Sequence, residues 1–261
     1  MKIVFLVPHP DDLEFGASFS CIQALKCGYE VVEAVMTLGE YGVTRDEFKG
    51  KRIQQLRSAE LDKASQVYLQ HTHNALRIIR MGYFDGYVPF NQQALNKVEG
   101  LLQSEKPEIF FAPDPFFSVD LHSDHLNTGR LAYFAIKALE KGERPHKLVF
   151  YYTFKPNLRL QTSFEDLEIL TEAVLQYKSQ INPSKIQSLK RLKKLSMRYK
   201  ALKSGAPYMN LRQIDAKTIE RDETHNVSKL TDKIKHATIS NLMVSLPGED
   251  RYKPSPKELG L

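Results

Sequence analysis

The stretch KIVFLVPHPDDLE, at residues 2–14, decides the fold class. Its first half, residues 2–7, is a continuous apolar run with β-branched side chains, which is typical of a strand buried on both faces of a parallel sheet. A Pro-His-Pro turn stops this run, and apolar residues at helical spacing follow from residue 14 to residue 26. A strand, a polar loop and a helix in this order predict the first unit of an α/β fold.

The alternation of strand and helix continues along the next part of the chain. The pattern predicts strands at residues 30–37, 75–81, 108–112 and 147–154, and helices at residues 46–69, 91–103 and 126–139. Helices of ten or more residues between strands predict a Rossmann-like, mostly parallel sheet flanked by helices. In such a fold, ligands bind at the carboxyl ends of the strands, which tells us where to look for chemistry.

The pattern changes near residue 160, and we divide the chain there. Residues 1–160 are predicted to form the α/β domain, and residues 161–244 a helical C-terminal extension packed on the same domain, with helices at 163–179 and 185–203. Residues 245–261 carry three prolines among charged residues, and this composition predicts an extended tail.

Composition narrows the class of protein. The chain has 261 residues, of which 42% are hydrophobic, and a net charge of +6, which favours an anionic ligand or surface without requiring nucleic acid. Cys21 and Cys27 lack the Cys-x-x-Cys spacing of a thiolate zinc site and are too few for a disulfide framework. No apolar run reaches the roughly 18 residues of a membrane span, and residues 3–7 are too short for a signal peptide. We therefore expect a cytoplasmic protein without a membrane span.

The turn after the first strand brings together an imidazole and several carboxylates. His9 and Asp12 are three residues apart, so a tight turn can direct both side chains at one point. A neutral imidazole with a carboxylate suits zinc, Fe²⁺ or another divalent first-row metal. Asp11 lies between them and points elsewhere, which makes it a candidate general base on water.

A second polar cluster follows the strand predicted at residues 108–112. His122 and His125 are also three residues apart, with Asp124 between them. If the two strands lie side by side, His125 completes a His/Asp/His set that leaves positions open for water and substrate, as in catalytic metal sites. His122 would then face the substrate oxygen, and Asp124 could accept an imidazole N–H and fix its tautomer.

Each cluster alone also has a simpler interpretation. Two aspartates after a strand often cap a helix, and a His-x-x-His pair is more often incidental than a metal site. Their joint position after parallel strands favours the metal site. Two rival classes remain open: a metal phosphoesterase, which would more often need two metals and more carboxylates, and a binding protein without enzymatic activity.

Two motifs together resemble a known family. Residues 8–14 (PHPDDLE) with residues 122–125 (HSDH) resemble the paired signature of the LmbE-like, or PIG-L, family of zinc-dependent N-acetylglucosaminide deacetylases. Further similar segments are TLGE at 37–40, RSAE at 57–60, GYFDG at 82–86 and YKSQ at 177–180, so the likeness covers roughly residues 3–180. The chain departs from the family at Asp120, where some members have tyrosine, and at Asn210, where an acid is usual.

The resemblance implies a function and a role for each matching residue. The implied reaction is hydrolysis of the N-acetyl amide of an N-acetylglucosamine-containing substrate, which releases acetate and a free amino sugar. It implies that His9, Asp12 and His125 hold Zn²⁺ and that Asp11 is the base. It also implies that His122 stabilises the oxyanion and protonates the leaving amine. The implied substrate-side residues are Arg57, Asp85 and Glu40. Family members form oligomers, so we also expect a homo-oligomer.

The segment at residues 178–212 is rich in lysine and arginine and lacks acidic residues. Apolar residues at helical spacing predict that one face of its helix packs on the protein while the charges line the opposite face; they are Ile186, Leu189, Leu192, Leu195, Tyr199 and Leu202. A solvated helix face is the simplest interpretation. The alternative is that this segment binds an anionic ligand or nucleic acid and carries the function. The chain has no tryptophan and no recognisable nucleic-acid motif, which argues against nucleic acid.

Overall fold

The computed structural model describes residues 1–42, 49–181 and 183–221. A seven-stranded sheet runs through it in the order β3-β2-β1-β4-β5-β7-β6. The first five strands in the chain are parallel; they are β1 (Lys2–Val7), β2 (Glu30–Thr37), β3 (Leu76–Tyr83), β4 (Ile109–Pro113) and β5 (Lys147–Tyr151). The predicted Rossmann-like sheet is therefore confirmed.

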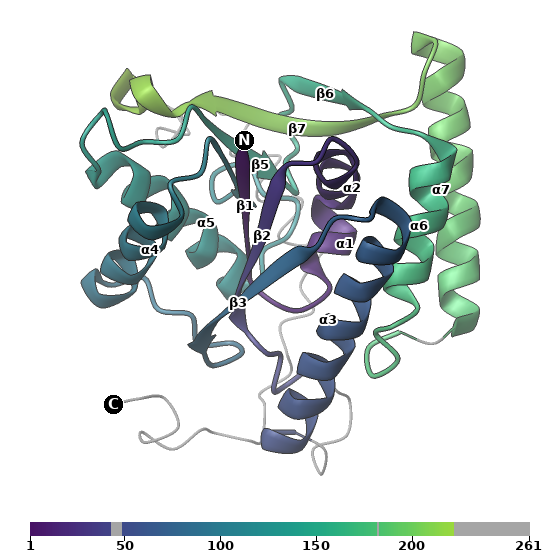
Figure 1. The fold of residues 1–261 in the computed structure, drawn as a ribbon, viewed down its shortest axis with the longest axis horizontal. Coiled ribbons are helices and arrows are strands. Elements are labelled where there is room, and N and C mark those ends of the chain that lie inside the picture. The colour runs from purple at the N-terminus through teal and green to yellow at the C-terminus, as the bar shows by residue number, and fades with distance from the viewer. Residues whose placement is uncertain (43–48, 182, 222–261) are drawn as a thin grey trace.

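Helices cover both faces of this sheet (Figure 1). One face carries α1 (Asp12–Gly16), α2 (Ser18–Lys26), α3 (Lys51–Thr72) and α6 (Phe164–Val174), and the other carries α4 (Gln92–Glu105) and α5 (Ser123–Ala138). A hydrophobic core lies on each face of the sheet, and alternate residues of β1 point into the two cores. Phe5 and Val7 pack on the first face, and Val4 and Leu6 pack on the second. All four side chains are completely buried, which explains why the strand reads as an uninterrupted apolar run.

The C-terminal extension is not purely helical. The sequence analysis missed β6 (Leu158–Gln161) and β7 (Tyr208–Asp215), which pair antiparallel with one another, while β7 also pairs antiparallel with β5. Between them lie α6 and the long helix α7 (Pro183–Ser204), and β7 is followed by the 3₁₀ helix η2 (Ala216–Arg221). β6 has only four residues and burial along β7 does not alternate strictly, so neither strand stands out in the sequence. Residues 222–244 of the predicted extension and the predicted tail, residues 245–261, lie outside the described residues.

The point where the strand order reverses lies between β1 and β4. Ile3, Val4 and Phe5 pair in register with residues 109–111, so the carboxyl ends of the two strands emerge side by side. The turn at residues 8–12 and the segment that leads into α5 therefore begin at the same edge of the sheet. This is the position at which open α/β sheets bind their ligands.

A buried ion pair fixes the segment after β4. The Arg212 guanidinium on β7 donates from Nε and Nη2 to the two carboxylate oxygens of Asp114, at 2.6 and 2.9 Å. The same carboxylate accepts the backbone N–H groups of Phe116 and Phe117. Arg212 is only 3% exposed, so it does not belong to a charged surface. β7 thus holds the loop that precedes the second histidine cluster.

Candidate metal centre

The turn after β1 is tight and carries an uncommon backbone conformation. Asp11 has φ of 97° and ψ of −19°, a left-handed conformation that aspartate tolerates better than most residues, although at a cost in energy. The backbone N–H of Asp12 donates to the carbonyl of His9 and closes the turn, and the N–H of His9 donates to Asp12 Oδ2. This arrangement turns Asp11 away from its two neighbours.

Three potential ligand atoms converge at the carboxyl ends of β1 and β4. His9 Nδ1 lies 3.0 Å from Asp12 Oδ2, His125 Nε2 lies 3.2 Å from the same oxygen, and the two nitrogens are 3.3 Å apart. Ligands held at 2.0–2.1 Å from a tetrahedral zinc ion would be about 3.3 Å from one another. The three side chains thus fit a single divalent cation, and they are the residues expected from the sequence to hold it.

Carboxylates lie behind both imidazoles. His9 directs Nε2 at Asp85 Oδ1 and Asp124 Oδ2, at 3.0 and 3.2 Å, whereas His125 Nδ1 lies 3.3 Å from Asp120 Oδ2 without the geometry of a hydrogen bond. Carboxylates in this position set the tautomer of metal-binding histidines. The sequence analysis gave this role to Asp124 only; Asp120, which follows β4 by several residues, was noted only as a departure from a family pattern.

A second set of ligand atoms, from His9, His122 and Asp124, also lies within 4.8 Å. The carboxylate of Asp124 is already engaged, because it accepts the backbone N–H groups of Gly86 and Val88 at 2.7 and 3.0 Å. This second set would also use the nitrogen of His9 that faces Asp85. The set formed with Asp12 and His125 is therefore the better metal site.

Charge and burial set the protonation of the neighbouring groups. Burial raises the pKa of Asp11 to about 6, although the Arg57 guanidinium opposes this shift. Burial also lowers the pKa of His122, with a further contribution from His9. Burial alone would lower the pKa of His9, but the carboxylates of Asp85, Asp12 and Asp124 outweigh it and raise that pKa well above its ordinary value. A site that attracts positive charge in this way suits a cation.

The geometry of His122 determines which of its nitrogens is available. It caps α5, and its Nδ1 accepts the backbone N–H of Asp124 at 3.3 Å. The ring proton of a neutral imidazole therefore resides on Nε2, which can donate to a ligand. The ring stands edge-on to His9, with 5.0 Å between ring centroids, so this donor lies beside the metal centre.

The three residues expected on the substrate side form a buried frame around the centre. Arg57 Nη2 donates to the carbonyl of Pro10 at 2.7 Å and lies 3.3 Å from Asp11 Oδ1. Glu40 accepts the backbone N–H of Asp85 at 3.0 Å, and Asp85 accepts that of Tyr41 at 3.0 Å. All three are less than 10% exposed. Their predicted contacts with sugar hydroxyls stay predictions.

Gly39 shows how closely this frame is packed. It has a φ of +68°, and a Cβ atom at this position would collide with the guanidinium of Arg57. Both the backbone conformation and the close approach therefore require glycine here. The carbonyl of Gly39 accepts a hydrogen bond from Arg57 Nη1 at 3.4 Å, which helps to hold the guanidinium against the turn that carries Asp11.

Tyr152, at the end of β5, is a site residue that the sequence analysis missed. Its hydroxyl donates to Asp12 Oδ1 at 3.4 Å, and its ring stacks on His125 with 5.6 Å between centroids. The sequence analysis placed the tyrosines at residues 151 and 152 in the strand predicted at residues 147–154 and gave them no role in the site. The place of Tyr152 at the carboxyl end of a parallel strand was the signal that could have pointed to the site.

Comparison with known proteins identifies the family. The PIG-L profile, described as GlcNAc-PI de-N-acetylase, matches residues 4–136, just over half of the 261-residue chain. The chain belongs to the PIG-L family. A diacetylchitobiose deacetylase of Thermococcus kodakarensis is 28% identical over 192 residues, which are 69% of this chain and 70% of that protein.

Solved structures show the same PIG-L fold. The N,N′-diacetylchitobiose deacetylase of Pyrococcus horikoshii superposes with a TM-score of 0.72 and 22% identity, over 89% of this chain and 88% of that one. A conserved protein of Thermus thermophilus gives a TM-score of 0.63 and 26% identity, over 80% and 93% of the two chains. The family assignment thus agrees with the resemblance carried by the motifs at residues 8–14 and 122–125.

Proposed function

We propose that this PIG-L protein is a metal-dependent deacetylase that hydrolyses the N-acetyl amide of an N-acetylglucosamine-containing substrate. The observation that carries the proposal is the convergence of ligand atoms from His9, Asp12 and His125 within 3.3 Å of one another, with Asp11 between the first two along the chain. The names of the matched deacetylases support the reaction, and the mutual distances of the three ligand atoms support a role for zinc or another divalent metal such as Fe²⁺.

The reaction adds water to the acetyl carbonyl carbon and breaks the C–N bond, so that acetate and a free amine are released. A divalent cation held by His9, Asp12 and His125 would polarise the carbonyl and supply hydroxide near neutral pH. Asp11 accepts the proton of the attacking water, and Arg57 positions its carboxylate through their contact at 3.3 Å.

His122 acts on the other side of the carbonyl group. Its Nε2–H donates to the oxygen on which negative charge develops, because Nδ1 is held by the backbone N–H of Asp124. As the C–N bond breaks, Asp11 passes the proton that it accepted from water to the leaving nitrogen, because a neutral His122 would have to become an imidazolate to supply one. Asp124 and Asp85 hold His9 in place, while Glu40 and Arg57 hold the surrounding loops.

The test is acetate release from a panel of substrates. We expect release from N-acetylglucosamine, from diacetylchitobiose or from a larger glycoside of N-acetylglucosamine, and none from N-acetyl-lysine, which offers the same amide without the sugar. Equal turnover of N-acetyl-lysine would contradict the sugar specificity. No release from any of the sugars by metal-loaded protein would contradict the reaction.

The location and assembly of the protein stay predictions. Within the described residues, every helix is too short or too polar to cross a bilayer. Cell fractionation tests the predicted cytoplasmic location, and light scattering of the purified chain tests the predicted homo-oligomer.

A further inference from the structure

The outward side of α7 exposes an unusual amount of apolar surface. We call Leu189, Leu192, Leu195, Tyr199 and Leu202 the α7 outer face; these side chains are 47%, 64%, 60%, 58% and 88% exposed. The helix packs inward instead through Ile186 and Met197, which are 3% and 4% exposed. The prediction that the six apolar residues form the packed face is therefore wrong for all of them but Ile186.

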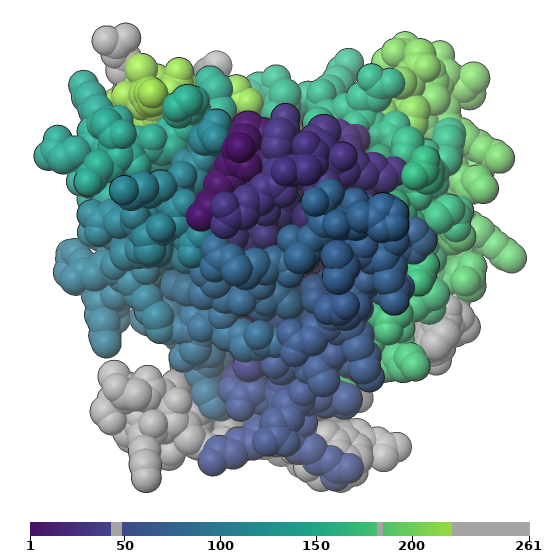
Figure 2. All heavy atoms as spheres, viewed as in Figure 1, coloured from purple at the N-terminus to yellow at the C-terminus, as the bar shows by residue number. Residues whose placement is uncertain are grey.

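The exposed residues form one continuous stripe. Leu192, Leu195, Tyr199 and Leu202 follow one another at spacings of three and four residues, which places them in a row along a helix. α7 is the outermost helix on its side of the molecule, beyond α6, and nothing among the described residues covers its far side (Figures 1 and 2). Contiguous exposed apolar surface of this kind marks a site of interaction.

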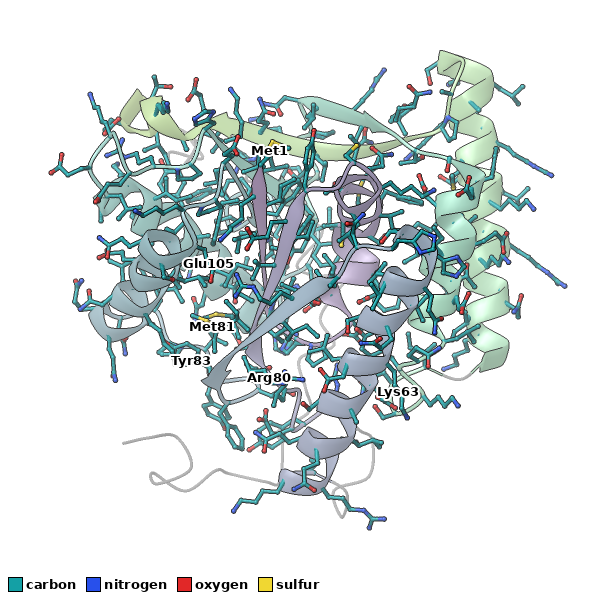
Figure 3. All side chains as sticks on the ribbon, viewed as in Figure 1. Met1, Lys63, Arg80, Met81, Tyr83 and Glu105 are labelled. Atoms are coloured by element: carbon teal, nitrogen blue, oxygen red, sulfur yellow. The ribbon has the colours of Figure 1, made fainter. Side chains whose placement is uncertain are left out.

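Positive charges flank the stripe. α7 contains eight lysines and arginines and no acidic residue, and these eight charges exceed the net charge of +6 of the whole chain. Long nitrogen-tipped side chains project from the outer side of the helix (Figure 3). Lys185, Arg191 and Arg198 are exposed, whereas Lys193 lies over the ring of Phe19 and Lys190 pairs with Glu168 of α6. The positive charge of the protein is thus concentrated around its most exposed apolar stripe.

The charge and the apolar side chains of the α7 outer face indicate which kind of partner it binds. A second copy of α7 would bring two sets of like charges together, which opposes self-association through this face. Nucleic acid would engage the lysines and arginines through its phosphates but leave the leucines exposed to water. An anionic bilayer engages both: leucines enter the boundary between headgroups and acyl chains, while lysine and arginine reach the lipid phosphates.

We propose that the α7 outer face docks the protein on the surface of a bilayer that contains anionic phospholipid. A helix of 22 residues, about 33 Å long at 1.5 Å per residue, lies flat on such a surface and does not cross it. The inference is independent of the deacetylase proposal, since none of the residues on this face belongs to the metal centre.

Vesicle sedimentation at physiological ionic strength tests the docking surface. The full chain is mixed with vesicles of phosphatidylcholine alone or of equal parts phosphatidylcholine and phosphatidylglycerol. We expect at least tenfold stronger binding to the mixed vesicles. L192S/L195S removes apolar contact and R191Q/R198Q removes charge, and each is expected to weaken binding tenfold or more. The matched control L56S/L69S changes two exposed leucines of α3 and should bind like the unaltered chain.

Each other outcome would overturn the proposal. Equal binding to both vesicles would exclude the role of anionic lipid, and binding unaffected by L192S/L195S would exclude the apolar stripe. No vesicle binding, with a smaller oligomer for L192S/L195S by light scattering, would assign the face to a second copy of the chain. No vesicle binding, with binding to a DNA duplex lost in R191Q/R198Q alone, would assign it to nucleic acid. Circular dichroism confirms that the exposed substitutions leave the fold intact.

Discussion

The candidate metal centre and the α7 outer face both concentrate charge, but they do so in opposite ways. At the metal centre, buried aspartates and histidines hold one another at fixed distances, and Asp124 is completely buried. On α7, Lys185, Arg191 and Arg198 are exposed to solvent beside exposed leucines. Each buried charge is stabilised by its own partner, so the loss of one partner is costly. Exposed charges contribute to the attraction of a ligand together, so the loss of one of them matters little. Single substitutions should therefore have large effects at the first region and small ones at the second.

The largest expected effect is the loss of a ligand. H125A removes one corner of the His9, Asp12 and His125 triangle, so we expect metal content and acetate release to disappear together. Metal analysis of the purified variant alongside the activity assay checks this. Full metal content with normal turnover would place the metal elsewhere.

Removal of the base should separate binding from catalysis. D11N keeps the size of the side chain but cannot accept a proton, and positioned bases contribute about 10²–10⁴-fold to the rate. We expect a loss of that size with metal content unchanged. The control is E14Q. It alters a buried carboxyl group two residues beyond Asp12, which accepts a hydrogen bond from the Tyr68 hydroxyl. Full activity in D11N would exclude Asp11 as the base.

A buried ion pair and an exposed one offer a direct contrast in stability. D114N leaves the buried Arg212 guanidinium without its counter-charge, for which we expect a loss of about 3–5 kcal/mol in the free energy of unfolding. E168Q removes the exposed partner of Lys190 on α7 and should cost less than about 1 kcal/mol. Urea denaturation measures both losses; equal losses would contradict the distinction between buried and exposed charge.

A weaker effect is expected behind the metal ligands. D120N replaces the carboxylate that faces His125 Nδ1 at 3.3 Å, and partners in this position contribute about 10–100-fold to metal affinity. Competition with a zinc chelator measures the change. D215N, at the exposed end of β7, is the matched control and should bind metal normally. An unchanged affinity in D120N would show that Asp120 does not orient the ligand.

The smallest effect is expected on α7. L192S alters a side chain that is 64% exposed, so the free energy of unfolding should change by less than about 0.5 kcal/mol. I186S, which places a hydroxyl in the core on the same helix, should cost several times more. Thermal unfolding compares the two. A large loss in L192S would mean that the α7 outer face is covered within the protein itself.

The sequence predicted the parallel sheet, and it predicted His9, Asp12 and His125 as candidate metal ligands, because both predictions depend on short, local patterns. The apolar run of β1 and the motifs at residues 8–14 and 122–125 needed only the assumption that β1 and β4 lie side by side. The antiparallel strands β6 and β7 depend on pairing with distant partners, which alternation alone did not reveal. On α7, the hydrophobic spacing predicted the wrong packed face: this face consists of Ile186, Met197 and Lys193, whose Nζ lies over the ring of Phe19.

Reconstitution of the metal-free protein with zinc tests the central claim most directly. After chelation, acetate release from diacetylchitobiose or the best sugar of the panel should be absent. It should then rise in proportion to added zinc and reach its maximum at one ion per chain, because His9, Asp12 and His125 provide one set of ligands. Undiminished release after complete removal of metal would contradict the account.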